Sequence, residues 1–348
     1  MSERFQDIRE RLGIPRLIII GFVLLLFVTA YATGMSIGPL VSASLVRIGM
    51  NGILVLAMVP TITAGVGLNF GLSVGILCGL VGSLISMELR IRGFSGFFAA
   101  ILFSMPLAVV AGWAYAKLLN KVKGQEMMVG TYVGFSMVAL MCIFWLAAPF
   151  SSPEMVWAYG GQGLRYTLTL DNYFGKVLNN FLLVSIGQWE FPLGLFGFFG
   201  LLCLLVHLFF RTKLGMAVKA AGANPRFAEA SGIDPDRTRT MGVIMSTVLG
   251  AIGIIVYAQS YGFLQLYMAP QMMGFPAIAA ILIGGANLRD ARIPHVLLGT
   301  ALFQTLLTIA LPVTSRVIEG DISEVARLII SNGMILYALT RRDGREVA

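Results

Sequence analysis

The sequence predicts an all-α polytopic membrane protein with about ten transmembrane helices. Three observations lead to this prediction. Of the 348 residues, 57% are hydrophobic and only 12% are charged, which is about half of the charged share of a soluble domain. Apolar runs long enough to cross a bilayer recur along the chain. Lys and Arg are divided unevenly between the segments that separate these runs. No stretch is polar enough to form a soluble domain, so residues 1–348 are expected to form a single transmembrane domain.

The apolar runs define the expected spans, because a helix needs about 20 apolar residues to cross the hydrocarbon core. We expect spans at residues 17–34, 44–66, 70–89, 94–116, 127–149, 189–210, 240–261, 272–285, 294–312 and 324–340. The second and third are nearly fused, and the eighth is short. The first follows basic residues and contains a possible signal-peptidase site at 30–32. Its 18 apolar residues are long for a signal peptide, so we expect an uncleaved helix.

The positive charges predict the orientation of these spans. With both termini cytoplasmic, the inner segments hold 18 of the 25 Lys and Arg residues. The outer segments then hold Arg90, Arg92, Arg165, Lys176 and Arg316, while Arg47 and Arg327 fall at span edges. An error of one span would move every later segment to the other side of the membrane and would remove this asymmetry. The two longest loops are therefore assigned to opposite sides, with 150–188 outside and 211–239 inside.

The inner loop at 211–239 predicts two short helices. The first covers residues 215–221 and is expected to end at Gly222. The second has Asn224 as its N-cap and Pro225 at its first position, and it ends before Gly232. A helix this short persists only when it packs against something. Its exposed side chains are expected to form a projecting docking surface for a cytoplasmic partner; they are Arg226, Phe227 and Glu229.

Residues 222–233 read Gly-Ala-Asn-Pro-Arg-Phe-Ala-Glu-Ala-Ser-Gly-Ile. This segment resembles the coupling loop of bacterial ABC-transporter permeases for simple sugars and nucleosides, a group related to the branched-chain amino acid permeases. The family pattern is Gly-x-Asn-Pro-x-Ala-Ala-x-x-x-Gly-Ile, and Phe227 replaces one Ala. Residues 72–75 (Leu-Ser-Val-Gly) resemble the end of a second family motif, Gly-Gly-Ile-Asp-Leu-Ser-Val-Gly, whose acid is absent here. A weaker match lies at 283–288. The resemblance covers about residues 40–340.

The resemblance implies an ABC importer permease in the bacterial inner membrane. It implies cytoplasmic ATP-binding subunits, a second permease that is homologous or identical, and a periplasmic solute-binding protein. ATP and Mg would be used by the partner ATPase, and this chain would need no cofactor and would not be an enzyme. Consistent with that, the chain lacks a Gly-x-x-x-x-Gly-Lys-Ser/Thr phosphate loop. The charge distribution follows membrane topology and gives no reason to expect a nucleic-acid partner. The implied ATPase-coupling residues are Gly222, Asn224, Pro225, Arg226, Phe227, Glu229 and Gly232.

Polar residues within apolar spans are candidates for the solute path, because a polar side chain in the hydrocarbon core costs free energy and therefore needs a reason to be there. The polar candidates are Asn51, Asn69, Ser73, Gln259 and Gln265, and Phe70 is added as a ring that would stack on the solute beside Asn69. Asn69 and Phe70 come first, since they lie in a Gly-rich break between two spans. The alternative is that Asn69 caps the third span. For Asn51 and Gln259, hydrogen bonds between helices are the favoured interpretation. No Asp or Glu lies in the middle of a span, which indicates a neutral solute.

Three other readings of the chain are open. A branched-chain amino acid permease would share the architecture. An ion-coupled secondary carrier would need acids within the spans, and these are lacking. An intramembrane enzyme would need a catalytic constellation, and two scattered histidines, His207 and His295, do not supply one or a metal site. The three cysteines are expected to be small core residues. Gly75, Gly79 and Gly82 recur at helical spacing, which predicts close packing of another span.

Overall fold

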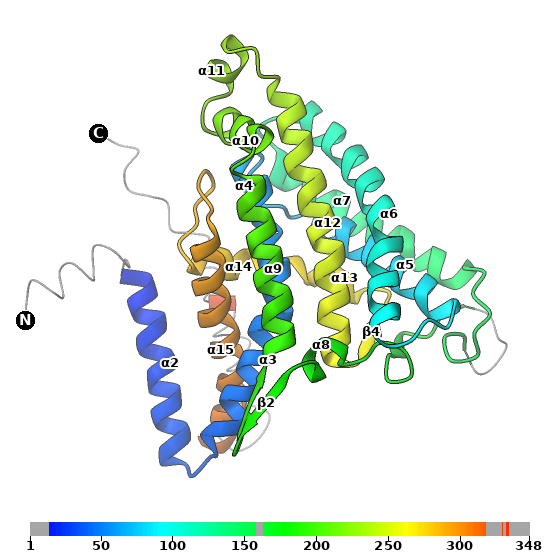
Figure 1. Cartoon of the computed structure of the whole chain (residues 1–348). Helices are drawn as coiled ribbons and strands as arrows, with labels where there is room; N and C mark the ends of the chain where they lie inside the picture. The colour runs from blue at the N-terminus through cyan, green and yellow to red at the C-terminus, as the bar shows by residue number, and fades with distance from the viewer. Residues whose placement is uncertain (1–13, 158–162, 318–328, 330–331, 334–348) are drawn as a thin grey trace, which may run out of the picture.

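The computed structural model describes residues 14–157, 163–317, 329 and 332–333. Long helices run between two ends of the molecule, and α10 and α11 stand at one of these ends (Figure 1). The helices are α2 (Ile14–Ala32), α3 (Ile37–Leu56), α4 (Met58–Thr63), α5 (Ser73–Glu88), α6 (Gly93–Lys121), α7 (Glu126–Ala147), α8 (Val177–Asn180), α9 (Leu193–Phe209), α10 (Lys213–Ala223), α11 (Pro225–Ala230), α12 (Pro235–Tyr261), α13 (Ala269–Met272), α14 (Gly274–Ile283) and α15 (Ile293–Val317).

Four short strands form two antiparallel pairs at the end opposite α11 (Figure 1). β1 (Thr167–Thr169) pairs with β4 (Phe263–Gln265), and Leu168 faces Leu264. β2 (Leu183–Ile186) pairs with β3 (Trp189–Pro192) as a hairpin that leads directly into α9. The predicted outer loop at 150–188 therefore contains β1, α8 and β2, and it closes on the end of α12 through β4.

Each of the first nine predicted spans coincides with one helix or with two consecutive helices. Among the described residues, five helices are long and apolar enough to cross a membrane: Ile37–Thr63, Gly93–Lys121, Glu126–Ala147, Pro235–Tyr261 and Ile293–Arg316. α9 and α10 pass the same test as a pair bent by 77°, and α2, α5 and α13–α14 are shorter apolar segments. The tenth predicted span, 324–340, and Arg327 lie outside the described residues, apart from three positions. The all-α membrane fold is thus confirmed, while the count of ten crossings stays a prediction.

The second span begins seven residues earlier than the predicted boundary at 44, because α3 starts at Ile37. Residues 37–43 contain Gly38, Pro39 and Ser42, a composition typical of a turn. Pro is nevertheless tolerated in the first turn of a helix, where its missing N–H would have no partner. The earlier start corrects the position of Arg47: it lies near the middle of the span Ile37–Thr63 and not at its edge.

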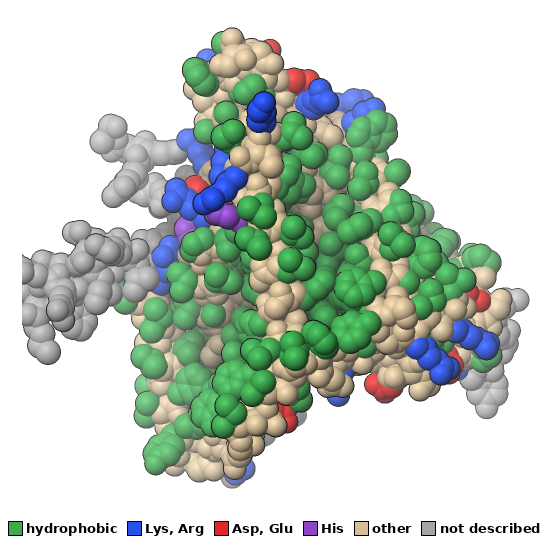
Figure 2. Space-filling model, in the orientation of Figure 1, with side chains coloured by type: hydrophobic (Ala, Val, Ile, Leu, Met, Phe, Trp, Pro, Cys, Tyr) green, Lys and Arg blue, Asp and Glu red, His purple; other side chains and the backbone are tan. Residues whose placement is uncertain are grey.

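Burial separates central from peripheral helices. In the most apolar windows of Ile37–Thr63 and Pro235–Tyr261, 72% of the residues are buried, whereas the corresponding value for α7 is 17%. The flanks of the molecule are covered by hydrophobic side chains, and Lys and Arg gather mainly toward the end that carries α10 and α11 (Figure 2). A peripheral apolar flank of this kind suits a nonaqueous surrounding. α7 is therefore peripheral, and α3–α4 and α12 form the centre.

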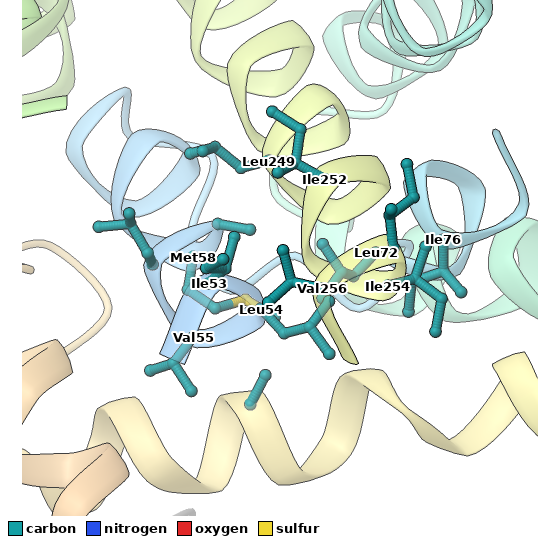
Figure 3. Close-up of a cluster of buried hydrophobic side chains, with 14 of the residues drawn as sticks. Ile53, Leu54, Val55, Met58, Leu72, Ile76, Leu249, Ile252, Ile254 and Val256 are labelled. Atoms are coloured by element: carbon teal, nitrogen blue, oxygen red, sulfur yellow. The ribbon is translucent and has the colours of Figure 1, made fainter. Parts of the chain in front are cut away.

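The centre of the molecule is packed through glycines. A Cβ on Gly75 would collide with the Thr247 carbonyl oxygen of α12, one on Gly79 with the Ala251 carbonyl, and one on Gly82 with that of Ala100 in α6. The predicted close approach of other spans to α5 is therefore confirmed. Around these contacts, apolar side chains of α3, α5 and α12 interdigitate (Figure 3); among them are Ile53, Leu54, Leu72, Ile76, Ile252 and Val256.

Candidate functional site

The segment between α9 and α12 projects from one end of the molecule (Figure 1). The chain bends by 77° after α9, and the Thr212 hydroxyl caps α10 by accepting a hydrogen bond from the Gly215 N–H at 3.2 Å. α11 follows at once. Asn224 Oδ1 accepts from the Phe227 N–H at 3.1 Å, and Pro225 occupies the first position of the helix. The predicted N-cap of the second short helix is therefore confirmed.

α11 is held by one face and exposed on the others. Ala228 is buried against the rest of the molecule, whereas Arg226, Phe227 and Glu229 are exposed. The Phe227 ring keeps 65% of its surface accessible. Two further apolar side chains of α10, Leu214 and Met216, are also exposed. Exposed apolar groups among charges at the polar end of a membrane protein are typical of a docking surface. Gly232 then ends the segment with a φ of +80°.

Gly222 has a different role from the predicted helix stop, since α10 continues to Ala223. Its backbone packs directly on the end of α4 and the segment behind it. A Cβ at Gly222 would collide with the Thr63 carbonyl oxygen and would lie 2.9 Å from the Gly65 nitrogen. Close approach of two backbones, and not left-handed geometry, is thus what requires glycine here. The contact joins the projecting segment to the break between α4 and α5.

Arg239 makes a second connection to the same break. This residue lies in the second turn of α12, and its guanidinium donates to the Gly65 carbonyl at 3.1 Å and to Asn120 Oδ1 of α6 at 3.1 Å. It also forms an ion pair with Glu126 of α7 at 2.5 Å. Both charged side chains are nearly buried, with 11% and 13% of their surfaces accessible. We define Arg239, Glu126, Asn120 and Gly65 as the arginine cluster.

The break itself carries Asn69, which is 3% exposed. Its Nδ2 donates to Ser246 Oγ of α12 at 2.8 Å, and its Oδ1 accepts from the Tyr115 hydroxyl of α6 at 3.2 Å. The N-cap position of α5 is Leu72, without a side-chain hydrogen bond, so the capping alternative for Asn69 is wrong. The residue instead joins three segments at the centre of the molecule.

Phe70 and Ser73 connect the break to α13 and α14. The Phe70 ring meets Phe275 edge-on at 5.9 Å, and Phe275 meets Phe135 of α7 at 6.4 Å. All three rings are partly accessible. Ser73 Oγ donates to the Pro270 carbonyl at 3.1 Å and is buried. The break thus presents an aromatic face beside a buried polar centre.

The remaining candidates of the solute path lie apart from Asn69. Asn51 donates to the Arg47 carbonyl within its own helix at 2.9 Å, so the favoured bond between helices is wrong for this residue. Gln259 is fully buried, and its amide binds Asn179 and the Leu178 N–H at the end of α12 that leads into β4. Gln265 lies in β4 opposite Thr167.

Sequence reasoning missed Ser246, Tyr115, Glu126 and Arg239 as members of these clusters. Ser246 and Tyr115 give no signal in the sequence, because one polar atom in an apolar helix is common. Arg239 and Glu126 look like ordinary charges at the ends of spans. The partners of Arg239 are more than 100 residues away in the sequence, and only the packing of α6, α7 and α12 brings them together.

These features define a class: a helical membrane protein whose exposed end segment is fastened to a break in its central spans. Residues 20–339 match the sequence pattern of the family described as the branched-chain amino acid transport system / permease component. Since the match includes nearly the whole chain, the chain belongs to this permease family and is a multi-pass membrane protein.

Two curated proteins are similar over part of the chain. The nucleoside ABC transporter permease protein NupC of Lactococcus lactis subsp. cremoris (strain MG1363) is 31% identical over 144 residues, which are 36% of this chain and 44% of that protein. The guanosine ABC transporter permease protein NupQ of Bacillus subtilis (strain 168) is 30% identical over 147 residues, which are 40% of this chain and 43% of that protein. The chain therefore spans less than half the length of these relatives.

A solved structure of a metal-chelate type ABC transporter in an inward-facing conformation aligns with 92% of this chain and 98% of that chain. The sequence identity is 16% and the TM-score is 0.44, a likeness too weak to bear on the fold.

Proposed function

We propose that the chain is the permease subunit of an ATP-driven ABC importer and forms the translocation path for a nucleoside-like solute or a simple sugar. The observation that supports this most directly is the attachment of α11 to the central break. α11 exposes Phe227 to a partner, and Gly222 and Arg239 connect its flanking helices to the segment that holds Asn69. Movement of α11 would therefore reach the centre of the spans.

The partners follow from this function. Two cytoplasmic ATP-binding subunits would dock on α10 and α11 and would bind ATP and Mg. A second permease, homologous or identical, would complete the path, and a periplasmic binding protein would deliver the solute at the end with the β2–β3 hairpin. In this proposal the chain lies in the bacterial inner membrane with both termini in the cytoplasm. The nucleoside class is supported by the names of the similar permeases.

Two alternatives are less well supported. The family description includes branched-chain amino acid transport, but the groups around Asn69 are neutral and offer no partner for the two charges of an amino acid. A secondary carrier would need carboxylates that bind the coupling ion. Within the described spans, Asp and Glu occur only at or near helix ends, as Glu88, Glu126 and Asp236 do.

The deciding experiment is purification of the chain in mild detergent from its native membrane, followed by identification of the co-purifying proteins. We expect an ATPase with a phosphate-binding loop, and ATP-driven uptake of a labelled nucleoside after the complex is reconstituted in liposomes. Recovery of the chain alone, with solute uptake in liposomes that contain no ATP, would exclude the importer function and favour a carrier.

A further inference from the structure

The β2–β3 hairpin and the residues that lead into it are unusually apolar for a loop in water. Residues 177–189 contain no Lys, Arg, Asp or Glu, and every residue from 181 to 190 is exposed. Leu182 and Ile186 keep 62% and 66% of their surfaces accessible. An exposed apolar surface of this extent marks contact with a membrane or with another protein.

The hairpin has two different faces. Side chains alternate between the faces of a strand, and residues that pair across two strands lie on the same face. We define the apolar face by its two cross-strand pairs, Val184 with Phe191 and Ile186 with Trp189. The opposite face carries the pair of Ser185 with Glu190. The hairpin is therefore amphipathic, with one face that suits an apolar surrounding and one that suits water.

Contacts with α3 show where the hairpin lies along the spans. β3 packs beside the first turns of α3 (Figure 1), and the Ser42 hydroxyl of α3 accepts a hydrogen bond from the Glu190 N–H at 2.9 Å. Two turns further along α3, a Cβ on Gly49 would lie 2.7 Å from the Leu195 side chain of α9. Because α3 and α4 form one of the membrane-spanning segments, the hairpin lies level with one end of a span.

The length of α9 leads to the same depth. Its 17 residues rise about 25 Å, whereas the hydrocarbon core is about 30 Å thick. Arg211 follows one end of α9, and a charge there marks a boundary of the hydrocarbon. At about 3.3 Å per residue, β3 adds about 13 Å at the other end. The hairpin would therefore occupy the last part of the hydrocarbon and the interfacial layer beyond it.

The chemistry of the surface favours lipid over a protein partner at this depth. The apolar face offers one polar group, the Trp189 indole N–H, whereas a protein interface carries about one hydrogen bond per 100–200 Å². Trp is enriched at membrane–water interfaces, where its ring meets lipid and its N–H meets water. Among the described residues, β2 has only β3 beside it. Its other backbone edge needs water or headgroups, which the interfacial layer provides and the hydrocarbon does not.

We propose that the β2–β3 hairpin lies in the membrane–water interface, with the apolar face against lipid and with Ser185 and Glu190 toward water. The partner of this surface is the bilayer. The inference goes beyond the transport function and does not depend on it, because it needs neither a solute nor an ATPase. It assigns the last part of the predicted outer loop at 150–188 to the membrane surface, where it would hold the adjoining ends of α3 and α9 at a fixed depth.

The test is spin-label accessibility in phosphatidylcholine vesicles, with the chain reconstituted together with its co-purifying proteins. Single cysteines are introduced after replacement of Cys78, Cys142 and Cys203. Oxygen collects in lipid, whereas a nickel chelate stays in water. The ratio of collisions with oxygen to collisions with nickel should be severalfold higher at Val184→Cys and Ile186→Cys than at Ser185→Cys. Ser185→Cys is the matched control, because it lies between these two positions on the opposite face.

Two results would overturn the inference. Frequent collisions with nickel at Val184→Cys and Ile186→Cys, as at Ser185→Cys, would place the hairpin in water. Few collisions with either reagent at these two positions would mean that a protein covers the apolar face. Glu229→Cys in α11 gives the reference for a position in water.

A second measurement uses no label. Ile186→Lys should lower the thermal unfolding temperature in the same vesicles, because a charge on the lipid side costs free energy. Ser185→Lys, on the other face, should leave it unchanged. Equal unfolding temperatures of the two variants would contradict the proposed orientation of the hairpin.

Discussion

Asn69 shows how one neutral side chain can join three segments within a membrane protein. Its amide both donates to Ser246 and accepts from Tyr115 while almost no water reaches it. Hydrogen bonds between helices in this setting contribute about 0.6 kcal/mol on average and up to about 1.7 kcal/mol. The break at 64–72 depends on such bonds, because its backbone is not paired within a regular helix.

Asn69→Ala should therefore lower the free energy of unfolding by about 1–2 kcal/mol, since it leaves the hydroxyls of Ser246 and Tyr115 without a partner. The thermal unfolding temperature in detergent measures this change. Asn51→Ala is the control, because the Asn51 amide binds only its own helix. Equal stability of both variants would show that the Asn69 bonds do not support the break.

Gly222→Ala should disturb the contact between α10 and the break. The added methyl group would meet the Thr63 carbonyl oxygen, and overpacking of this kind costs about 1–3 kcal/mol. We expect solute-stimulated ATPase activity of the complex to fall severalfold with the chain still inserted in the membrane. Gly200→Ala in α9 is the control, because no atom lies within 4 Å of the added Cβ. Full stimulation in Gly222→Ala would argue against this path of coupling.

At the scale of elements, α12 connects the docking segment to everything else. It begins directly after α11, packs on α5 and α6 along its length, and ends in β4 at the opposite end of the molecule. Arg239 fixes its first turns to α6, α7 and the break. A rigid element fastened at this point would transmit a displacement of α11 across the membrane.

Arg239→Lys should weaken this connection although the charge is retained. An ammonium group cannot match the fork geometry that reaches Gly65, Asn120 and Glu126 together. Removal of a partner from a nearly buried ion pair costs about 3–5 kcal/mol, so Glu126→Gln should be strongly destabilising as well. Thermal unfolding and solute-stimulated ATPase activity are the measurements.

The matched control for the arginine cluster is Lys123→Ala. Its ion pair with Asp236, at 2.5 Å, is about half exposed, and exposed pairs contribute about 0–1 kcal/mol. A loss in Lys123→Ala as large as that in Arg239→Lys would mean that general charge at this end, and not the cluster, is responsible.

α11 is expected to meet the ATPase through its charged side chains and Phe227. Reversal of both charges, Arg226→Glu together with Glu229→Arg, should abolish solute-stimulated ATPase activity while membrane insertion stays normal. Both positions are exposed, so the substitution should not alter folding. Arg316→Glu at the other end is the control. Normal stimulation in the double variant would remove α11 from the ATPase interface.

At the scale of the whole molecule, the two ends differ in chemistry. One end carries α10, α11 and most of the Lys and Arg side chains (Figure 2), and the other carries the two β-pairs. The positive-inside rule predicts that the first end faces the cytoplasm.

The orientation can be tested by cysteine labelling after replacement of Cys78, Cys142 and Cys203. In spheroplasts, Ser185→Cys in the exposed hairpin should react with a membrane-impermeant thiol reagent. Glu229→Cys in α11 should react only after the membrane is permeabilised. Labelling of Glu229→Cys in sealed spheroplasts would reverse the topology.

The sequence by itself determined the membrane class, the places of nine spans and the local form of α11. These features depend on runs of apolar residues, on charge between them and on caps such as Asn224–Pro225, all of which are local. It also pointed to Asn69, because a Gly-rich break is visible in the chain. The prediction was wrong for the start of α3, where Pro39 in a first helical turn has the composition of a loop.

Only the tertiary structure decided the partners of these residues. Asn69 and Ser246 are separated by 177 positions, and Arg239 and Gly65 by 174. Such pairs are set by the way α6, α7 and α12 pack around α5, which depends on glycines at close contacts and not on any local pattern. The position of a side chain relative to a helix on another span is a property of the assembled bundle, and for this reason no local pattern in the sequence determines it.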